Sequence, residues 1–288
     1  MKSLRQLSWG AADILIAYSR GEQPPYGFSR ALNVHNGNEG PVSAADLAVN
    51  EWLLDGLELN FSSVNWSLLS EESVKDNSSK NFSMSSEWLW ILDPLDGTKD
   101  FISGSGDYAV HLALVRDQKP VLGVVLIPEK EELWFGLLGK GAWCENRFGQ
   151  KRFVSFSRRS NFEEMVLVAS RSHRDERLEK LIEILKLGKQ MAVGSIGCKI
   201  GTILRGESDV FISLSGKTSP KDWDMAAPEA LLRAAGGEFT HANLVNLKYR
   251  NEGFSQSGCI IGSNGMNHSL LCEKTLEAMS LIDPEFSV

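Results

Sequence analysis

The sequence Trp-Ile-Leu-Asp-Pro-Leu-Asp-Gly-Thr-Lys-Asp-Phe, at residues 90–101, decides how the rest of the chain is interpreted. The apolar run at 88–92 predicts a buried strand, because it is too short for a helix and rich in aromatic and branched residues. Pro94 has a fixed φ and no N–H, so we expect a stiff turn that holds Asp93 and Asp96 in one relative placement. Two carboxylates held together repel each other unless a cation or a shared proton relieves them.

Two interpretations of this stretch follow from its residues alone. Asp, Gly and Pro are common turn residues, so an acidic turn after a strand is an ordinary structural feature. Alternatively, the oxygen ligands hold a hard cation, Mg²⁺ before a transition metal, while Gly97 lets the backbone approach a ligand and Thr98 adds a hydroxyl.

The composition is that of an ordinary globular protein. The chain has 288 residues, 42% apolar and 23% charged, which is enough for one large domain or two modest ones. Its net charge of -7 argues against general binding to nucleic acid or anionic membranes, so an anionic substrate would need local cations. The four cysteines form no C-x-x-C pair, and no run is apolar enough for a signal peptide or a membrane span. We therefore expect a cytoplasmic protein without stable membrane insertion.

Apolar periodicity and turn residues predict alternating elements. Helices are expected at 4–19, 43–57, 176–187, 194–204, 223–235 and 268–281, with Pro228 close to the first turn of its helix. Strands are expected at 64–69, 88–92, 108–115, 121–127, 132–137, 166–169, 191–193, 210–214 and 259–262. The break near 158–163 predicts two domains, 1–158 and 159–288. The alternation in the second half favours an α/β layer with functional residues at strand ends.

Two motifs, read together, identify a family resemblance. Asp-Pro-Leu-Asp-Gly-Thr-Lys-Asp-Phe at 93–101 resembles the first signature of the inositol monophosphatase superfamily, which comprises Mg²⁺-dependent, lithium-sensitive phosphatases. Trp223-Asp224-Met225-Ala226-Ala227-Pro228, followed by Gly236-Gly237, resembles the second signature. The resemblance covers most of the chain, from the Pro41 region through Ser263, and implies an α/β (α+β) fold built as a layered αβαβα sandwich. The ending Lys99-Asp100-Phe101 is similar to the branch that hydrolyses 3'-phosphoadenosine 5'-phosphate (pAp).

The resemblance also assigns candidate metal ligands. It implies two or three Mg²⁺ ions held by Glu71, Asp93, Asp96, Asp224 and the Leu95 carbonyl. Each acid has a simpler alternative, because a Glu pair after a strand is usually solvated and an Asp at a helix start is usually a cap.

Catalytic and substrate-binding candidates come from the same comparison. Asp46, Glu72 and Thr98 would orient the attacking water, but Ser43 and Asp46 also form a capping box, so Asp46 keeps two explanations. The resemblance places substrate contacts at Gly97, Thr98, Ser170, His173, Ser195 and Lys199, where a helix start near Lys199 would offer N–H groups to a second phosphate. The Ser- and Asn-rich stretch at 74–86 is a candidate lid.

The expected function is a Mg²⁺-dependent phosphomonoesterase that converts pAp into AMP and phosphate, with the related sulfur-pathway nucleotide PAPS as a further substrate. Two alternatives stay open. One is an inositol monophosphatase or broad sugar-phosphate phosphatase acting on inositol 1-phosphate or fructose 1,6-bisphosphate. The other is a metal-binding regulatory protein that has lost catalysis. Dimers in the family make a homodimer the expected assembly.

Overall fold

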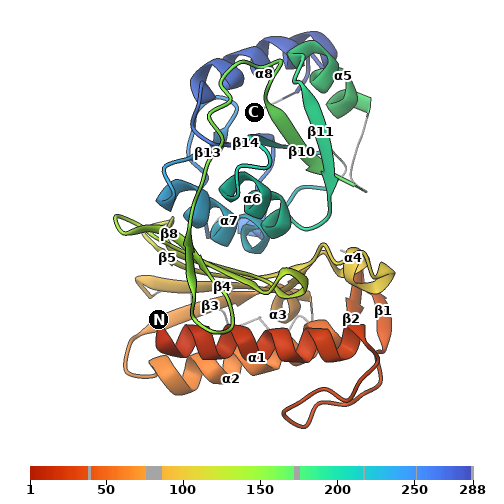
Figure 1. Ribbon diagram of the computed structural model, residues 1–288, viewed down its shortest axis with the longest axis vertical. Coiled ribbons are helices and arrows are strands. Elements are labelled where there is room, and N and C mark those ends of the chain that lie inside the picture. The colour runs from red at the N-terminus through yellow and green to blue at the C-terminus, as the bar shows by residue number, and fades with distance from the viewer. Residues whose placement is uncertain (38–39, 76–85, 172–175, 217, 251, 287–288) are drawn as a thin grey trace.

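The computed structural model describes residues 1–37, 40–75, 86–171, 176–216, 218–250 and 252–286. These residues form two large β-sheets separated and flanked by helices, and one two-stranded hairpin (Figure 1). The first half holds helices α1 (Lys2–Ser19) and α2 (Ala44–Phe61), the hairpin β1 (Val34–Gly37) and β2 (Gly40–Ser43), and two short helices, α3 (Glu71–Lys75) and α4 (Thr98–Ser103). Its seven-stranded sheet has the order β3-β4-β5-β6-β7-β8-β9. These strands are β3 (Trp66–Ser70), β4 (Trp88–Asp96), β5 (Ala109–Arg116), β6 (Lys119–Ile127), β7 (Glu132–Leu137), β8 (Gly141–Glu145) and β9 (Lys151–Phe153).

The second half forms a five-stranded sheet of order β11-β10-β12-β14-β13. Its strands are β10 (Val166–Ser170), β11 (Lys189–Val193), β12 (Val210–Leu214), β13 (Glu238–His241) and β14 (Cys259–Ser263). Its helices are α5 (Glu176–Leu185), α6 (Ile196–Leu204), α7 (Asp222–Ala234) and α8 (His268–Ile282). Strands β11, β10 and β12 run parallel, as the expected α/β alternation requires, whereas β14 and β13 are antiparallel to their neighbours.

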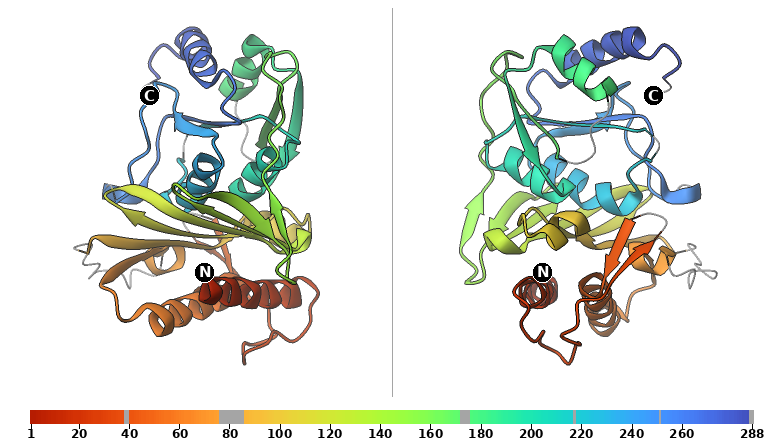
Figure 2. Two further views of the ribbon diagram at one scale, coloured as in Figure 1. Left: turned by 60° about the vertical axis from the view of Figure 1, so that its left-hand side comes forward. Right: turned by 90° about the vertical axis from the view of Figure 1, so that its right-hand side faces the viewer.

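Five layers follow one another along the molecule (Figures 1 and 2). Helices α1 and α2 cover one face of the seven-stranded sheet, and α6 and α7 cover the other face. Beyond α6 and α7 lies the five-stranded sheet, whose outer face is covered by α5 and α8. The predicted αβαβα sandwich is therefore confirmed.

Strand β4 shows why this arrangement follows from an apolar run. Leu89 and Ile91 belong to the core shared with α6 and α7, whereas Trp90 and Leu92 belong to the core beneath α1 and α2. A strand covered on both faces reads as continuously apolar, because successive side chains point to opposite faces. Each such side chain contributes about 1.5–3 kcal/mol on burial.

Two glycines seat α7 directly on the large sheet. A Cβ at Gly123 would lie 2.5 Å from the carbonyl oxygen of Ala227, and one at Gly136 would lie 2.6 Å from the Cα of Leu231. Only residues without a side chain permit so close an approach of helix and strand. The helix that carries Asp224 is thereby held against the strands of the first half.

Several local expectations are corrected. The strand does not end in a turn at Pro94: β4 continues to Asp96, with a register shift between Asp93 and Asp96 that accommodates a residue without an N–H. Pro228 is the seventh residue of α7 and thus lies in the helix interior instead of the first turn. Strands β8, β9 and β13 were not predicted.

The domain division at 158 stays a prediction. All strands of the seven-stranded sheet precede this position and all strands of the five-stranded sheet follow it, yet α7 packs on β5, β6 and β7 of the first half.

Candidate active site

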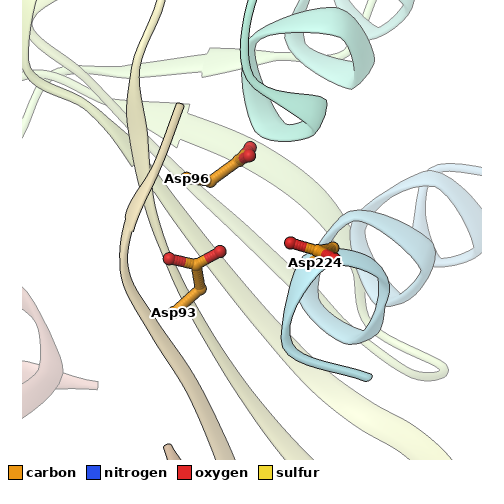
Figure 3. A group of neighbouring side chains, drawn as sticks. All are labelled: Asp93, Asp96 and Asp224. Carbon is orange, nitrogen blue, oxygen red and sulfur yellow. The ribbon is translucent and has the colours of Figure 1, made fainter. Parts of the chain in front are cut away.

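Three carboxylates from distant parts of the chain converge between the large sheet and α7. Asp93 and Asp96 lie at the end of β4, and Asp224 lies in the first turn of α7 (Figure 3). One carboxylate oxygen from each lies within 4.8 Å of the others. The bulge in β4 turns both of its acids toward the helix start, and the close seating of α7 brings Asp224 to them.

The surroundings of Asp93 and Asp224 disfavour the charged form of both carboxylates. Burial, followed by the charges of Glu71, Asp96 and Asp224, raises the pKa of Asp93 well above its usual range. Burial, followed by the charges of Asp96 and Glu71, does the same for Asp224. Buried carboxylates of this kind need a cation, and a donor set made only of oxygen suits Mg²⁺ or Ca²⁺. The residues present therefore fit a hard divalent ion.

Glu71 and Glu72 form the first turn of α3, directly after β3. Glu72 is only 4% exposed, so the solvated surface pair that a Glu-Glu after a strand usually forms is not what the structure contains. Burial raises the pKa of Glu72 to about 7 despite the opposing charge of Lys75. Glu71 lies outside the tight group of three aspartates, but its charge acts on both Asp93 and Asp224.

Asp46 forms the expected helix cap and also contacts Thr98, while its catalytic role stays a prediction. Its Oδ2 accepts hydrogen bonds from the Ser43 backbone N–H (2.8 Å) and the Ser43 hydroxyl (2.6 Å), which completes the capping box of α2. Its Oδ1 accepts a hydrogen bond from Thr98 Oγ1 (3.1 Å), which also lies 3.2 Å from the Leu95 carbonyl oxygen. Burial raises the pKa of Asp46 to about 6. One carboxylate thus caps a helix and holds the Thr98 hydroxyl.

Asp96 is tied to the start of α6. Its Oδ2 accepts hydrogen bonds from Ser195 Oγ (2.5 Å) and the Gly197 N–H (3.0 Å), and His111 Nε2 lies 3.1 Å away. Although burial acts to raise it, His111 and then Lys199 lower the pKa of Asp96 to about 2. The helix start near Lys199 was expected to offer N–H groups to a phosphate, but the Gly197 N–H donates to the Asp96 carboxylate.

His111 belongs to neither signature motif and was not among the predicted site residues. It lies on β5, opposite Asp93 in the strand register, and is 1% exposed. A Cβ at Gly197 would lie 2.3 Å from its Nε2, so the glycine at the start of α6 makes room for this imidazole. Only the antiparallel pairing of β4 with β5, which places residue 111 beside the acidic motif, could have identified this histidine.

The cations on the expected substrate side, Lys199 and Arg171, are influenced by nearby acids. Lys199 is 4% exposed, and burial lowers its pKa while the charge of Asp96 opposes that effect. Arg171 donates through Nη1 to Asp100 Oδ1 (2.8 Å) and through Nη2 to Asp107 Oδ2 (2.5 Å). Asp107 Oδ2 also accepts the Gly194 N–H (3.2 Å). Asp100, in the first signature, is therefore joined to Arg171, and Asp107, six residues after the signature, is joined to both Arg171 and Gly194.

Of the remaining predicted positions, Gly97 and Ser170 lie within the described residues, whereas others lie outside them. Gly97 adopts φ +92°, and a Cβ there would lie 2.9 Å from the Asp107 carbonyl oxygen, so the residue requires glycine. Ser170 ends β10, next to Arg171. His173 and most of the candidate lid at 74–86 lie outside the described residues.

Comparison with known proteins adds a family to this geometry. The profile described as "Inositol monophosphatase family" matches residues 3–280. The chain belongs to the inositol monophosphatase family. Among curated family relatives, the chain is 32% identical to the "3'(2'),5'-bisphosphate nucleotidase CysQ" of Buchnera aphidicola over 227 residues, which cover 78% of this chain and 80% of the relative. It is also 32% identical to the protein of the same name from Escherichia coli K12 over 233 residues, 80% of this chain and 86% of the relative.

Solved structures of the inositol monophosphatase family share the fold. An IMPase from Thermotoga maritima matches with a TM-score of 0.74 at 23% identity and covers 98% of this chain and 96% of its own. The extragenic suppressor protein suhB from Bartonella henselae matches with a TM-score of 0.75 at 24% identity, over 96% and 97% of the two chains. Family membership supports phosphatase activity on a phosphorylated small molecule. Within the described residues, no helix combines the length and apolar character needed to cross a membrane.

Proposed function

We propose that the chain is a Mg²⁺-dependent phosphomonoesterase that removes the 3'-phosphate of pAp, giving AMP and phosphate, and that also accepts PAPS. The observation that carries the reaction class is the meeting of Asp93, Asp96 and Asp224 beside the Asp46–Thr98 pair. The substrate assignment is supported by relatives at 32% identity whose name is 3'(2'),5'-bisphosphate nucleotidase.

Glu71, Asp93, Asp96, Asp224 and the Leu95 carbonyl would hold two or three Mg²⁺ ions in this proposal. When bound, Mg²⁺ lowers the pKa of water and neutralises charge on the phosphate and on the leaving oxygen. The carboxylate cluster fits such ions because its members are buried, close together and supply only oxygen.

The protein's own contribution is to position the attacking water and to accept its proton. The Thr98 hydroxyl is held in one place by Asp46 and the Leu95 carbonyl, so it can orient a water molecule. Burial raises the pKa of Asp46 to about 6 and that of Glu72 to about 7. A carboxylate with a pKa near the working pH is suited to act as a general base. Asp46 and Glu72 are therefore the proposed proton acceptors.

The proposed phosphate contacts are the N–H groups of Gly97 and Thr98, at the point where the backbone takes a left-handed turn into α4. Ser170, His173, Ser195 and Lys199 are the proposed nucleotide contacts. Lys199 supplies a buried positive charge in a chain of net charge -7. Such a local cation offsets the repulsion between an acidic protein and an anionic substrate.

A substrate comparison tests the proposal. The purified protein is assayed with Mg²⁺ against pAp, PAPS, inositol 1-phosphate and fructose 1,6-bisphosphate, each with and without Li⁺. We expect the highest kcat/KM for pAp, PAPS next, and inhibition by Li⁺. A preference for inositol 1-phosphate or the sugar bisphosphate would replace the nucleotidase with the broader phosphatase. If none of the four substrates releases phosphate, the remaining hypothesis is that the chain is a metal-binding regulatory protein that has lost catalysis.

Asp96→Asn is the matched inactive variant. We expect its kcat to fall by at least about 10²-fold, because a metal ligand that contributes several kcal/mol to the transition state is lost. The asparagine side-chain oxygen can still accept hydrogen bonds from Ser195 and Gly197, so the circular dichroism spectrum should change little. Urea unfolding then measures the stability lost with the carboxylate charge beside His111 and Lys199. Near wild-type hydrolysis of pAp by Asp96→Asn would show that the site is wrongly assigned.

A further inference from the structure

Lys75, in the last turn of α3, lies between the two glutamates of the same helix. Its Nζ is 2.8 Å from Glu71 Oε1 and 3.0 Å from Glu72 Oε1. The Lys75 side chain is 14% exposed, and those of Glu71 and Glu72 are 17% and 3% exposed. This ammonium is therefore largely buried against two acids, one of which is a proposed metal ligand and the other a proposed base.

The charge of Lys75 extends beyond these two contacts. It opposes the effects that raise the pKa of Glu72 and of Asp224. The positive charge thus acts on α3 and, across the site, on the first turn of α7. A partly buried cation is screened less by solvent than an exposed one, so this interaction is stronger than that of a surface lysine.

An ammonium and a divalent cation cannot share Glu71 without cost. Two positive charges brought to one carboxylate repel each other, and the repulsion is large where water is excluded. Lysine has a flexible four-carbon stem and no fixed fork, so its head can leave a carboxylate when another cation takes its place.

We propose that Lys75 is the internal counter-ion of this site: it neutralises Glu71 when no Mg²⁺ is bound and is displaced from Glu71 when Mg²⁺ binds. The inference rests on the proposed role of Glu71 as a metal ligand. Lys75 then has two opposite effects, since it stabilises the metal-free protein and weakens Mg²⁺ binding. Neither signature motif contains this residue, and its role follows from the i,i+4 and i,i+3 spacing on α3.

The test compares Lys75→Met with Lys180→Met, both without substrate. Lys180 is a matched control because its Nζ makes the same i,i+4 contact, 2.7 Å from Glu176 Oε1, on α5 and in an exposed position. Mg²⁺ affinity is measured by titration calorimetry and Tm is measured in EDTA. For Lys75→Met we expect a Kd for Mg²⁺ about three- to tenfold lower than wild type and a Tm in EDTA about 2–4 °C lower. Lys180→Met should change neither quantity.

Lys75→Arg serves as the conservative variant and should keep the Tm in EDTA close to that of wild type. The proposal is overturned if Lys75→Met binds Mg²⁺ with unchanged or weaker affinity, because Lys75 would then only support α3. It is equally overturned if the wild-type protein binds no Mg²⁺. Since no substrate is present, failure of the pAp assignment is separate: a Kd shift in Lys75→Met stands whichever phosphate ester is hydrolysed.

Discussion

At the scale of single residues, Asp46 shows how one side chain satisfies two interpretations of the same motif. The capping box uses Oδ2 and leaves Oδ1 for Thr98, so helix capping and support of the Thr98 hydroxyl do not compete. The carboxylate is completely buried, which makes each of its hydrogen bonds necessary. The cap and the proposed catalytic role can therefore be tested separately by mutating Ser43 or Thr98 and leaving Asp46 in place.

We predict that Ser43→Ala lowers the free energy of unfolding by about 1 kcal/mol with little loss of kcat, because a cap hydroxyl is removed. Thr98→Val should also lower the free energy of unfolding, by about 1 kcal/mol or more, because the buried Asp46 Oδ1 loses its donor. It should in addition reduce kcat about 10²-fold or more, because the hydroxyl proposed to orient the water is lost. Urea unfolding and steady-state hydrolysis of pAp measure the two effects, with Thr98→Ser as the active control. Equal losses of kcat in Ser43→Ala and Thr98→Val would contradict the separation.

At the scale of elements, ion pairs join the first signature to the second half of the chain. Arg171, just after β10, bonds to Asp100 in α4 and to Asp107 ahead of β5. Asp107 also holds Gly194, just ahead of α6. Arg171 and Gly194, which adjoin the proposed substrate residues Ser170 and Ser195, are thus tied to Asp100 and Asp107, close in sequence to the proposed phosphate-binding turn at Gly97. These hydrogen bonds of Arg171, Asp100 and Asp107 do not include Asp93 or Asp224. We therefore expect these contacts to affect substrate placement more than metal binding.

Arg171→Met should accordingly raise KM for pAp several-fold while kcat changes less. The unfolding free energy should fall by about 1 kcal/mol, a value reduced for the 43% exposure of the Arg171 side chain. Arg171→Lys should restore KM and the unfolding free energy only in part, because an ammonium lacks the forked guanidinium that bonds to two carboxylates.

Arg116→Met, which removes an exposed ion pair with Glu87, is the control and should leave KM unchanged. A fall in kcat for Arg171→Met without a change in KM would argue against a positioning role.

At the scale of the whole molecule, the carboxylate site exists only where both halves meet. Asp93 and Asp96 come from the first sheet, whereas Asp224 and the start of α6 come from the layer between the sheets. The central core likewise contains side chains from both sheets, among them Ile91 and Ile260. Folding therefore gathers acids whose mutual repulsion lowers stability unless protons or cations relieve it.

This repulsion predicts that the increase in Tm caused by Mg²⁺ depends on pH. The pKa values of Asp93 and Asp224 are raised on folding, so above about pH 4 the metal-free folded state binds more protons than the unfolded chain. Its stability then falls as pH rises, and a bound cation removes that loss. The lowered pKa of Asp96, about 2, acts in the opposite direction but only below this range. Mg²⁺ should raise Tm more at about pH 8 than at about pH 5.5.

Calorimetric scans at both pH values, with Mg²⁺ and with EDTA, measure the difference, and Asp224→Asn should reduce it. An equal Tm gain at both pH values would show that the cluster does not carry the expected charge.

Much of the fold could be predicted because its signals are local. Alternating apolar runs and turn residues placed β5, β6, β7 and β12 to within two residues, and the two signatures identified the family. The misplaced features depend on context: Pro94 continues a strand because a bulge absorbs its missing donor, and Pro228 is accommodated inside a helix packed on the sheet. The spacing of residues along the chain carries no information on either accommodation.

The sequence by itself determined the chemistry of the candidate site: a set of buried acids, a threonine hydroxyl and a glycine turn, in the pattern of one phosphatase family. Only the tertiary structure decided which groups meet. His111 reaches Asp96 through the pairing of β4 with β5, Asp224 reaches Asp93 through the packing of α7 on the large sheet, and Asp96 bonds to the start of α6, where N–H groups were expected to bind a phosphate. The physical reason is that residue type sets what a group can bind, whereas strand register and helix packing set the distances over which charges and hydrogen bonds act.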